Sequence, residues 1–147
     1  MAQLSALDTL IELATKQTDD AARRLGKAMR AGDDAQQKLQ LLQQYRDDYA
    51  ARMQTNAMSG LSASGYRNFQ HFLDKLDDAI ASQQKIVQDA HMRVNNERGA
   101  WQDSERKRMS YDMLATRALN AQLLEQARRE QKQTDEFAAR KLLYKRS

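Results

Sequence analysis

A heptad repeat of apolar residues, never interrupted by proline, constrains this chain more than any other feature. Alternating steps of three and four residues from Leu4 to Met53 give fifteen positions, and twelve of them are apolar. A repeat of this kind over seven heptads is typical of a coiled-coil seam. The exceptions are Thr18, Gly32 and Arg46. The pattern therefore predicts one long helix over about residues 3–54.

A second and weaker seam runs from Phe69 to Ala118, with ten of its fourteen positions after Phe69 apolar. Between the seams, residues 54–65 hold two glycines, three serines and no charge, which is the composition of a loop. Ser62 or Ser64 can cap a following helix through its hydroxyl group. We therefore expect a loop over about residues 55–65 and a second helix over about residues 66–140.

One loop between two seams predicts the fold class. We expect an all-α fold in which residues 1–147 form a single domain, a long antiparallel two-helix coiled-coil hairpin. Pairing Met53 with Phe69 gives facing residues whose numbers sum to about 122, so that Leu4 faces Ala118. The second helix then outruns the first, and residues 119–147 form an overhang with no helix partner in this chain.

The composition offers little for catalysis or for a membrane span. The chain has no cysteine, and its two histidines, His71 and His91, lie about 30 Å apart along one predicted helix, too far to share a metal. It contains no phosphate-binding glycine loop and no hydrolase or metalloprotease motif. No apolar run approaches the roughly 18 residues that cross a bilayer. We expect no enzyme activity, no cofactor, no metal and no membrane span.

The start of the second helix carries an apolar stripe wider than one facing helix can cover. Phe72, Ala79 and Ile86 recur at seven-residue spacing beside the main seam and widen the stripe. A two-stranded seam uses only two positions of each heptad, so one facing helix does not cover the whole stripe. An exposed apolar patch of this kind suggests a partner. The alternatives are that the first helix or the folded-back loop, with Met58 and Leu61, covers the stripe, or that it drives weak self-association. The exposed members are expected among Phe72, Leu76, Ala79 and Ile86.

Positive charge gathers at the end of the chain. Residues 104–147 hold eleven basic and six acidic residues, whereas residues 1–103 are nearly neutral. A basic tail can meet nucleic acid, acidic lipid or an acidic protein surface. Few aromatic residues accompany the charges, which speaks against base stacking and nucleic-acid binding. A solvated helical tail is the plain alternative.

Several short strings occur along the chain in a characteristic order. They begin with Asp19-Asp20-Ala21-Ala22-Arg23 and Leu25-Gly26, and they continue through Tyr45 and Tyr49. The further strings are Asn68-Phe69-Gln70, Phe72, Leu76, Ala79-Ile80, Gln83-Gln84, Trp101, Gln131-Lys132 and Asp135-Glu136-Phe137-Ala138. Together, these strings resemble the flagellar export protein family FliJ over the whole chain.

The resemblance implies a function. FliJ-like proteins are cytoplasmic components of the flagellar type III export apparatus, peripheral at the inner-membrane base of the flagellum. They fold as a hairpin similar to the gamma-subunit stalk of rotary ATPases. They contact the export ATPase FliI, whose ring assembly they promote, and the export gate protein FlhA. FliH and export chaperones are further expected partners.

The resemblance also implies site residues. The family's gate-binding patch carries over onto Phe72, Leu76 and Ala79, with Gln83 at a position where the family can carry histidine. By analogy with a rotor stalk, the end with both termini approaches the ATPase ring. The residues assigned to that contact are Asp19, Arg23, Leu25, Arg128 and Phe137.

Two other functions stay open on the sequence. A generic structural or adaptor coiled coil, such as an injectisome stalk relative, has the same periodicity without a specific patch. A basic nucleic-acid-binding helix has the same charged tail, and its affinity falls steeply with salt.

Overall fold

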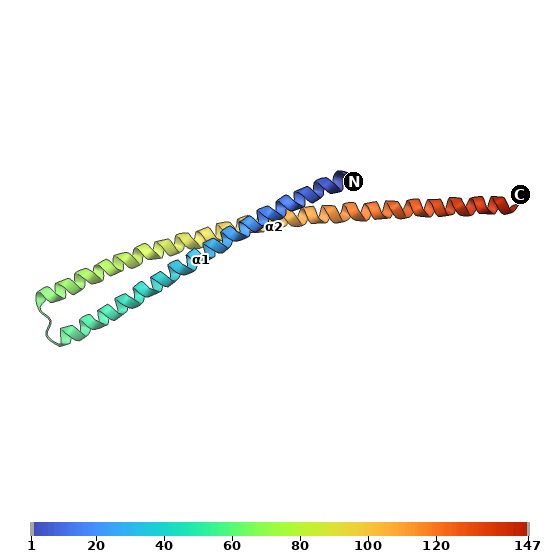
Figure 1. The fold of residues 1–147 in the computed structure, drawn as a ribbon. Coiled ribbons are helices and arrows are strands. Elements are labelled where there is room, and N and C mark those ends of the chain that lie inside the picture. The colour runs from blue at the N-terminus through green and yellow to red at the C-terminus, as the bar shows by residue number, and fades with distance from the viewer. Residues whose placement is uncertain (1, 147) are drawn as a thin grey trace. The chain divides into compact units, whose positions relative to one another are not determined.

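The structure, a computed structural model, describes residues 2–146, with side chains from Leu4 onward. Helix α1 spans Ala2–Met58 and helix α2 spans Ala63–Arg146, and the described residues contain no strand. The two helices pack against each other in opposite directions and are joined by residues 59–62 (Figure 1). The all-α helical hairpin predicted from the two seams is therefore confirmed. Both helices extend beyond their expected ends, and the loop is shorter than the expected 55–65.

Local chemistry explains where the loop begins and ends. Gly60 has a φ of 92°, a left-handed conformation that glycine adopts without steric cost. The Gly65 backbone N–H donates to Ser62 Oγ at 3.2 Å, so Ser62 caps α2. A β-carbon at Gly65 would lie 3.1 Å from Leu61 Cδ1, closer than ordinary packing allows. Glycine at position 65 thus lets Leu61 pack on the first turn of α2.

The contacts within the chain divide it into two compact units. The hairpin unit is Asp20–Gln102, and the terminal unit combines Met1–Asp19 with Asp103–Ser147. In a pair of long helices, each residue contacts only residues at a similar position along the helix axis. The contacts of a long seam therefore need not join it into one compact body.

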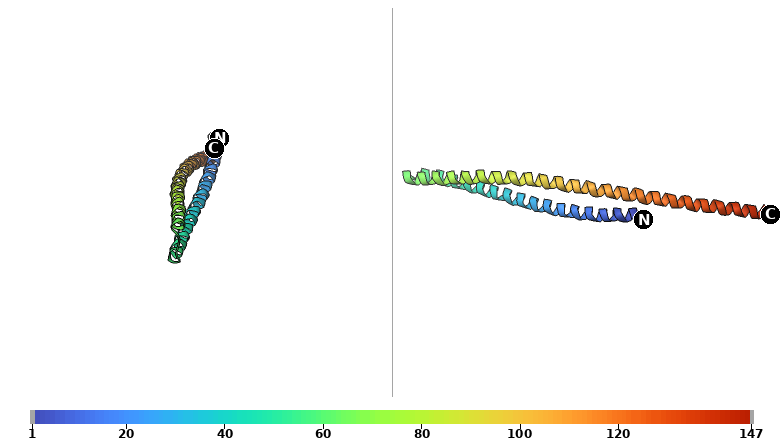
Figure 2. Two further views of the ribbon diagram at one scale, coloured as in Figure 1. Left: turned by 90° about the vertical axis from the view of Figure 1, so that its left-hand side faces the viewer. Right: turned by 90° about the horizontal axis from the view of Figure 1, so that it is seen from above.

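The seam of the hairpin unit lies where the heptads place it. Every predicted seam position from Ala21 to Met53 and from Phe69 to Trp101 is buried or half-buried. Ala35, Leu39 and Val87 form a core cluster against which Ile80 packs. Figures 1 and 2 show the green ends of α1 and α2 side by side next to the loop.

Three polar contacts fix the register of the hairpin unit. Gln83 Nε2 donates to the Ala35 carbonyl oxygen at 2.9 Å, and Arg24 Nε lies 3.4 Å from Glu97 Oε2. Arg46 Nε donates to Asp77 Oδ1. The numbers of these pairs sum to 118, 121 and 123, which confirms the predicted sum of about 122.

The terminal unit pairs the first turns of α1 with the middle of α2. Ala14 and Thr18 are buried, and the Thr18 hydroxyl donates to the Ala14 carbonyl oxygen at 2.9 Å. Leu4 and Ala115 line the same surface hollow, in agreement with the predicted register. Every residue of α2 from Leu119 to Arg146 is exposed. This stretch is the unpaired segment, and its position is the one predicted for the overhang.

Candidate functional site

The predicted gate-binding residues divide into two exposed and two buried side chains. Ala79 is exposed and Phe72 is 38% exposed. Leu76 and Gln83 are only 8% and 5% exposed, because both lie in the seam that faces α1. The assignment of Leu76 and Gln83 to a partner contact stays a prediction, and the exposed area of both side chains is small.

Helix α1 covers part of the apolar stripe with aromatic rings. The Tyr49 ring centroid lies 5.1 Å from that of Phe69 and 4.6 Å from that of Phe72. The Tyr45 ring meets Phe72 edge-on at 6.5 Å. Such tilted and edge-on pairs are favourable ring geometries. One face of Phe72 is therefore held by α1, and the rest of the ring reaches solvent.

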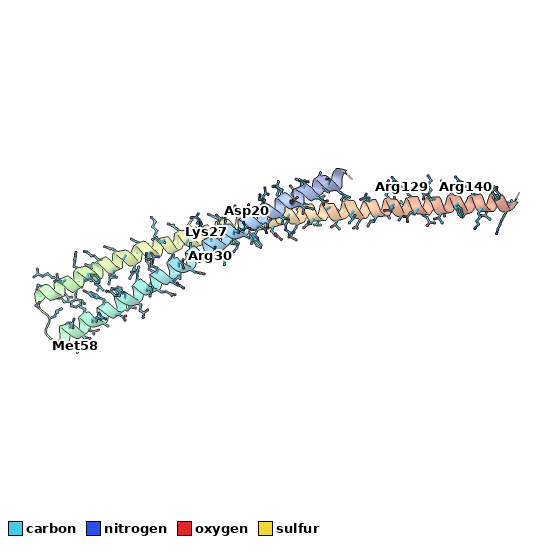
Figure 3. All side chains as sticks on the ribbon, viewed as in Figure 1. Asp20, Lys27, Arg30, Met58, Arg129 and Arg140 are labelled. Atoms are coloured by element: carbon cyan, nitrogen blue, oxygen red, sulfur yellow. The ribbon has the colours of Figure 1, made fainter. Side chains whose placement is uncertain are left out.

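The loop leaves this stripe open. Met58 is 88% exposed at the end of α1 (Figure 3), and Leu61 packs beside Gly65 on the first turn of α2. Of the two alternatives for covering the stripe, the structure supports partial cover by α1 and contradicts cover by the folded loop. Ile86 is 51% exposed and extends the stripe along α2.

Two exposed apolar residues of α1 were missed by the sequence analysis. Tyr45 is 55% exposed and touches Phe72, and Leu41 is 66% exposed one turn earlier. Tyr45 directly precedes the seam position Arg46, just as Phe72 precedes Leu73. Reading the positions that flank the seam on both helices would have found Tyr45 together with Phe72. We call Leu41, Tyr45, Phe72, Ala79 and Ile86 the apolar face.

The unpaired segment of α2 presents side chains in all directions. Figure 3 shows Arg129 and Arg140 on this segment. It holds seven basic and four acidic residues, a net charge of +3. Phe137 is 66% exposed, with Lys141 Nζ 5.8 Å from its ring centroid. Leu123, Leu124, Leu142 and Leu143 are also more than half exposed. A helix with this much apolar surface in solvent is suited to burial against another protein.

The five residues assigned to the ATPase contact lie on both helices. Arg23 and Leu25 belong to the hairpin unit, whereas the other three belong to the terminal unit. Within the terminal unit, Asp19 acts electrostatically on Arg108, while Arg128 lies about 30 Å further along α2 by helical rise. The assignment of the five residues to one partner stays a prediction. Arg128 and Phe137 are its members on the unpaired segment.

The terminal unit carries the densest ion pairs of the described residues. Arg108 Nη2 lies 2.6 Å from Glu105 Oε1, and Arg108 Nη1 lies 2.9 Å from Asp112 Oδ2. The hydrogen bond from Arg108 lowers the pKa of Glu105 from its ordinary value, and the same bond raises the pKa of Arg108. All three side chains are partly exposed, so we treat this cluster as local support for α2.

Residues 2–146 contain no group of three or more His, Cys, Asp or Glu side chains that could hold a metal ion. In the same range, neither helix has a stretch apolar enough to cross a membrane. His71 and His91 are both exposed. The apolar face and the unpaired segment both expose large apolar side chains, as surfaces that bind protein partners do.

Comparison with known proteins identifies a family for this chain. The model of the family described as "Flagellar FliJ protein" matches residues 3–147. The chain is 32% identical over 145 residues to the flagellar FliJ protein of Salmonella typhi, with 99% of each chain covered. It is 30% identical over 145 residues to that of Escherichia coli (strain K12), again with 99% of each chain covered. The hairpin fold and the full-length matches together place this chain in the flagellar FliJ protein family.

Proposed function

We propose that this chain is a non-enzymatic component of the flagellar type III protein export apparatus, which links the export ATPase to the export gate. Membership of the FliJ family supports a role in flagellar export. In this role the protein is cytoplasmic and sits at the inner-membrane base of the flagellum. It aids assembly of the ATPase and the handling of chaperones and substrates.

The observation that carries the proposal is the presence of two separate exposed apolar surfaces on one hairpin. The apolar face lies in the hairpin unit, and the unpaired segment lies in the terminal unit. A protein with one partner needs one such surface, whereas a linker needs two. We assign the apolar face to the gate protein FlhA and the unpaired segment to the ATPase FliI.

The gate contact rests on Phe72 and its neighbours. The α1 rings hold Phe72 in place, so little side-chain freedom is lost when a partner covers it. Covering an apolar side chain fully is worth roughly 1.5–3 kcal/mol, and the exposed part of Phe72 accounts for a corresponding fraction. Ile86 and Tyr45 add further area on either side.

The ATPase contact rests on the unpaired segment. Its exposed leucines and Phe137 offer apolar area, and its net charge of +3 favours an acidic surface on the partner. FliH and export chaperones are further proposed partners, with no surface assigned to them.

The experiment compares two variants in two assays. Truncation after Ala118 should abolish stimulation of FliI ATPase activity while FlhA pull-down persists. Phe72→Ala should weaken FlhA pull-down while ATPase stimulation persists. Unchanged stimulation by the truncated chain would refute the ATPase contact, and unchanged FlhA capture by Phe72→Ala would refute the gate contact.

A further inference from the structure

The two sides of the hairpin seam differ in chemistry. On one side, the positions next to the seam include three large apolar residues, Tyr45, Phe72 and Ile86. On the opposite side the equivalent positions are mostly glutamine or charged, and Met29 is their only large apolar residue. These polar positions include Gln36, Gln43, Gln70, Asp77 and Gln84. A partner helix that seeks apolar area is therefore directed to one side.

The same side continues into a hollow with a small-residue floor. The hollow has a volume of about 350 Å³, and its floor includes Ala28 and Ala31. Arg24, Lys27 and Arg93 supply three cationic groups at its rim, and Glu97 is the one carboxylate. Since Arg24 lies 3.4 Å from Glu97, these two charges offset each other. We call this hollow the basic cradle.

Lys27 and Arg93 are the unbalanced charges of the basic cradle. Both are exposed, and neither forms an ion pair within residues 4–146. They come from different helices and border the same hollow. Two cations above an alanine floor can receive carboxylate side chains of a helix that approaches closely, because alanine leaves room for its backbone.

The spacing of the two features suits a single helix. Phe72 and Arg93 lie on α2 within one unit, about 32 Å apart by helical rise, which is the length of a helix of about 20 residues. On α2 the apolar face extends from Phe72 to Ile86, about 21 Å of this distance, and the basic cradle lies at the far end. A helix that covers both would pack against the hairpin unit as a third strand of the bundle.

We propose that the basic cradle is a second docking point, which holds the acidic end of an amphipathic partner helix whose apolar side covers Phe72 and Ile86. The inference deepens the proposed function and rests on it in one respect, since the partner helix is taken to be the one that covers Phe72. The cradle selects partners by carboxylate position, and the apolar face supplies contact area. A second copy of this chain and a free anion are the competing occupants.

The test uses a designed amphipathic peptide of about 20 residues, with leucine on one face and three glutamates at one end. A second peptide carries the glutamates at the other end, and a third has glutamine in their place. Fluorescence anisotropy measures their binding to the full chain. The variants are Lys27→Glu with Arg93→Glu, Phe72→Ala, and a control in which Lys85→Glu and Arg98→Glu reverse two charges away from the cradle.

The inference predicts that one glutamate peptide binds and that Lys27→Glu with Arg93→Glu weakens it about tenfold, since two attractive surface pairs become repulsive. The glutamine peptide should bind more weakly, and its affinity for the double variant should equal its affinity for the unchanged chain. The control variant should change neither affinity by more than about twofold. Sedimentation of the free chain should give a constant monomer mass as concentration rises.

Three results would overturn the inference. They are equal binding of the glutamate and glutamine peptides, equal effects of the cradle and control variants, or a chain that dimerises and then excludes the peptide. Competition by inorganic phosphate alone, with no dependence on Phe72, would assign the cradle to an anion and also overturn it. If Phe72→Ala weakens peptide binding but leaves FlhA capture unchanged, the proposed gate contact is refuted, and the docking role of the basic cradle is still supported.

Discussion

Replacing Leu76 by alanine should destabilise the hairpin, and Ile86→Ala is its matched control. Both substitutions remove three carbon atoms from α2, but Leu76 is 8% exposed and Ile86 is 51% exposed. Losing three buried carbons at about 0.8 kcal/mol each lowers the free energy of unfolding by about 2.4 kcal/mol at Leu76. In globular cores the residual cavity raises the cost of such a change towards about 5 kcal/mol. A two-helix seam is bordered by solvent, so we expect the lower figure.

At Ile86 about half of that transfer energy is lost, and the better helix propensity of alanine returns about 0.4 kcal/mol. The net change is about 0.8 kcal/mol. For a chain of this size, each kcal/mol shifts Tm by about 2–4 °C. Leu76→Ala should therefore lower Tm by about 5–10 °C, and Ile86→Ala by about 2–3 °C. Thermal melts followed by circular dichroism measure both.

Binding should respond in the opposite order. In pull-down at a temperature where both variants are folded, Ile86→Ala should weaken capture of FlhA more than Leu76→Ala, because only Ile86 offers area to a partner. Equal shifts in Tm, or a Leu76→Ala variant that keeps its Tm and loses FlhA capture, would refute the placement of Leu76 in the seam.

Three further changes test the packing and the charges. Gly99→Ala should raise the free energy of unfolding by about 1 kcal/mol, since a β-carbon there meets no atom within 4 Å; a destabilised variant in denaturant titration would contradict this. Gln83→Ala should lower it by about 1–2 kcal/mol in the same assay, because the bond to the Ala35 carbonyl oxygen is lost; no change would show that the bond does not form. The pKa of Glu105 is lowered in the folded chain, so its ion pair with Arg108 stabilises the folded state at pH values above the unfolded pKa of about 4.3. This contribution is lost as the pH falls through the lowered pKa. Glu105→Gln should therefore flatten the loss of Tm below about pH 4.5, and parallel pH profiles would speak against the pair.

The heptad pattern was enough to predict the fold and the register. Facing positions in a coiled coil are set by the 3.5-residue repeat alone, and one pairing, Met53 with Phe69, fixes all the others. The pairing of Leu4 with Ala118 followed from the same arithmetic.

The pattern did not predict the ends of the helices at the loop. The heptad seam ends at Met53, but α1 continues beyond it to Met58. Thr55 donates its hydroxyl to the Ala51 carbonyl oxygen, and Ser59 donates to that of Thr55, both at 3.1 Å. The Ser59 bond satisfies one of the last four carbonyl groups of α1, and the Thr55 bond is an additional one within the helix, where a loop-like composition suggested that the helix had ended.

The candidate site was predicted only in part, because periodicity predicts which side of a helix faces its partner helix but not how deeply each side chain is buried. Leu76 and Gln83 occupy seam positions, and the transfer of the family patch onto them conflicted with that assignment. Phe72 and Ile86 occupy flanking positions, where exposure depends on the side chains of α1. Tyr45 and Tyr49 cover one face of Phe72, which could be known only once the rings were placed.

Simultaneous binding of both partners tests the central claim most directly. The masses of complexes formed by the full chain with FliI and the cytoplasmic part of FlhA can be measured by light scattering during gel filtration. The proposal predicts a complex that contains all three proteins, which Phe72→Ala reduces to the FliI complex and truncation after Ala118 reduces to the FlhA complex. Partners that displace each other, or a single change that removes both, would contradict a linker with two separate surfaces.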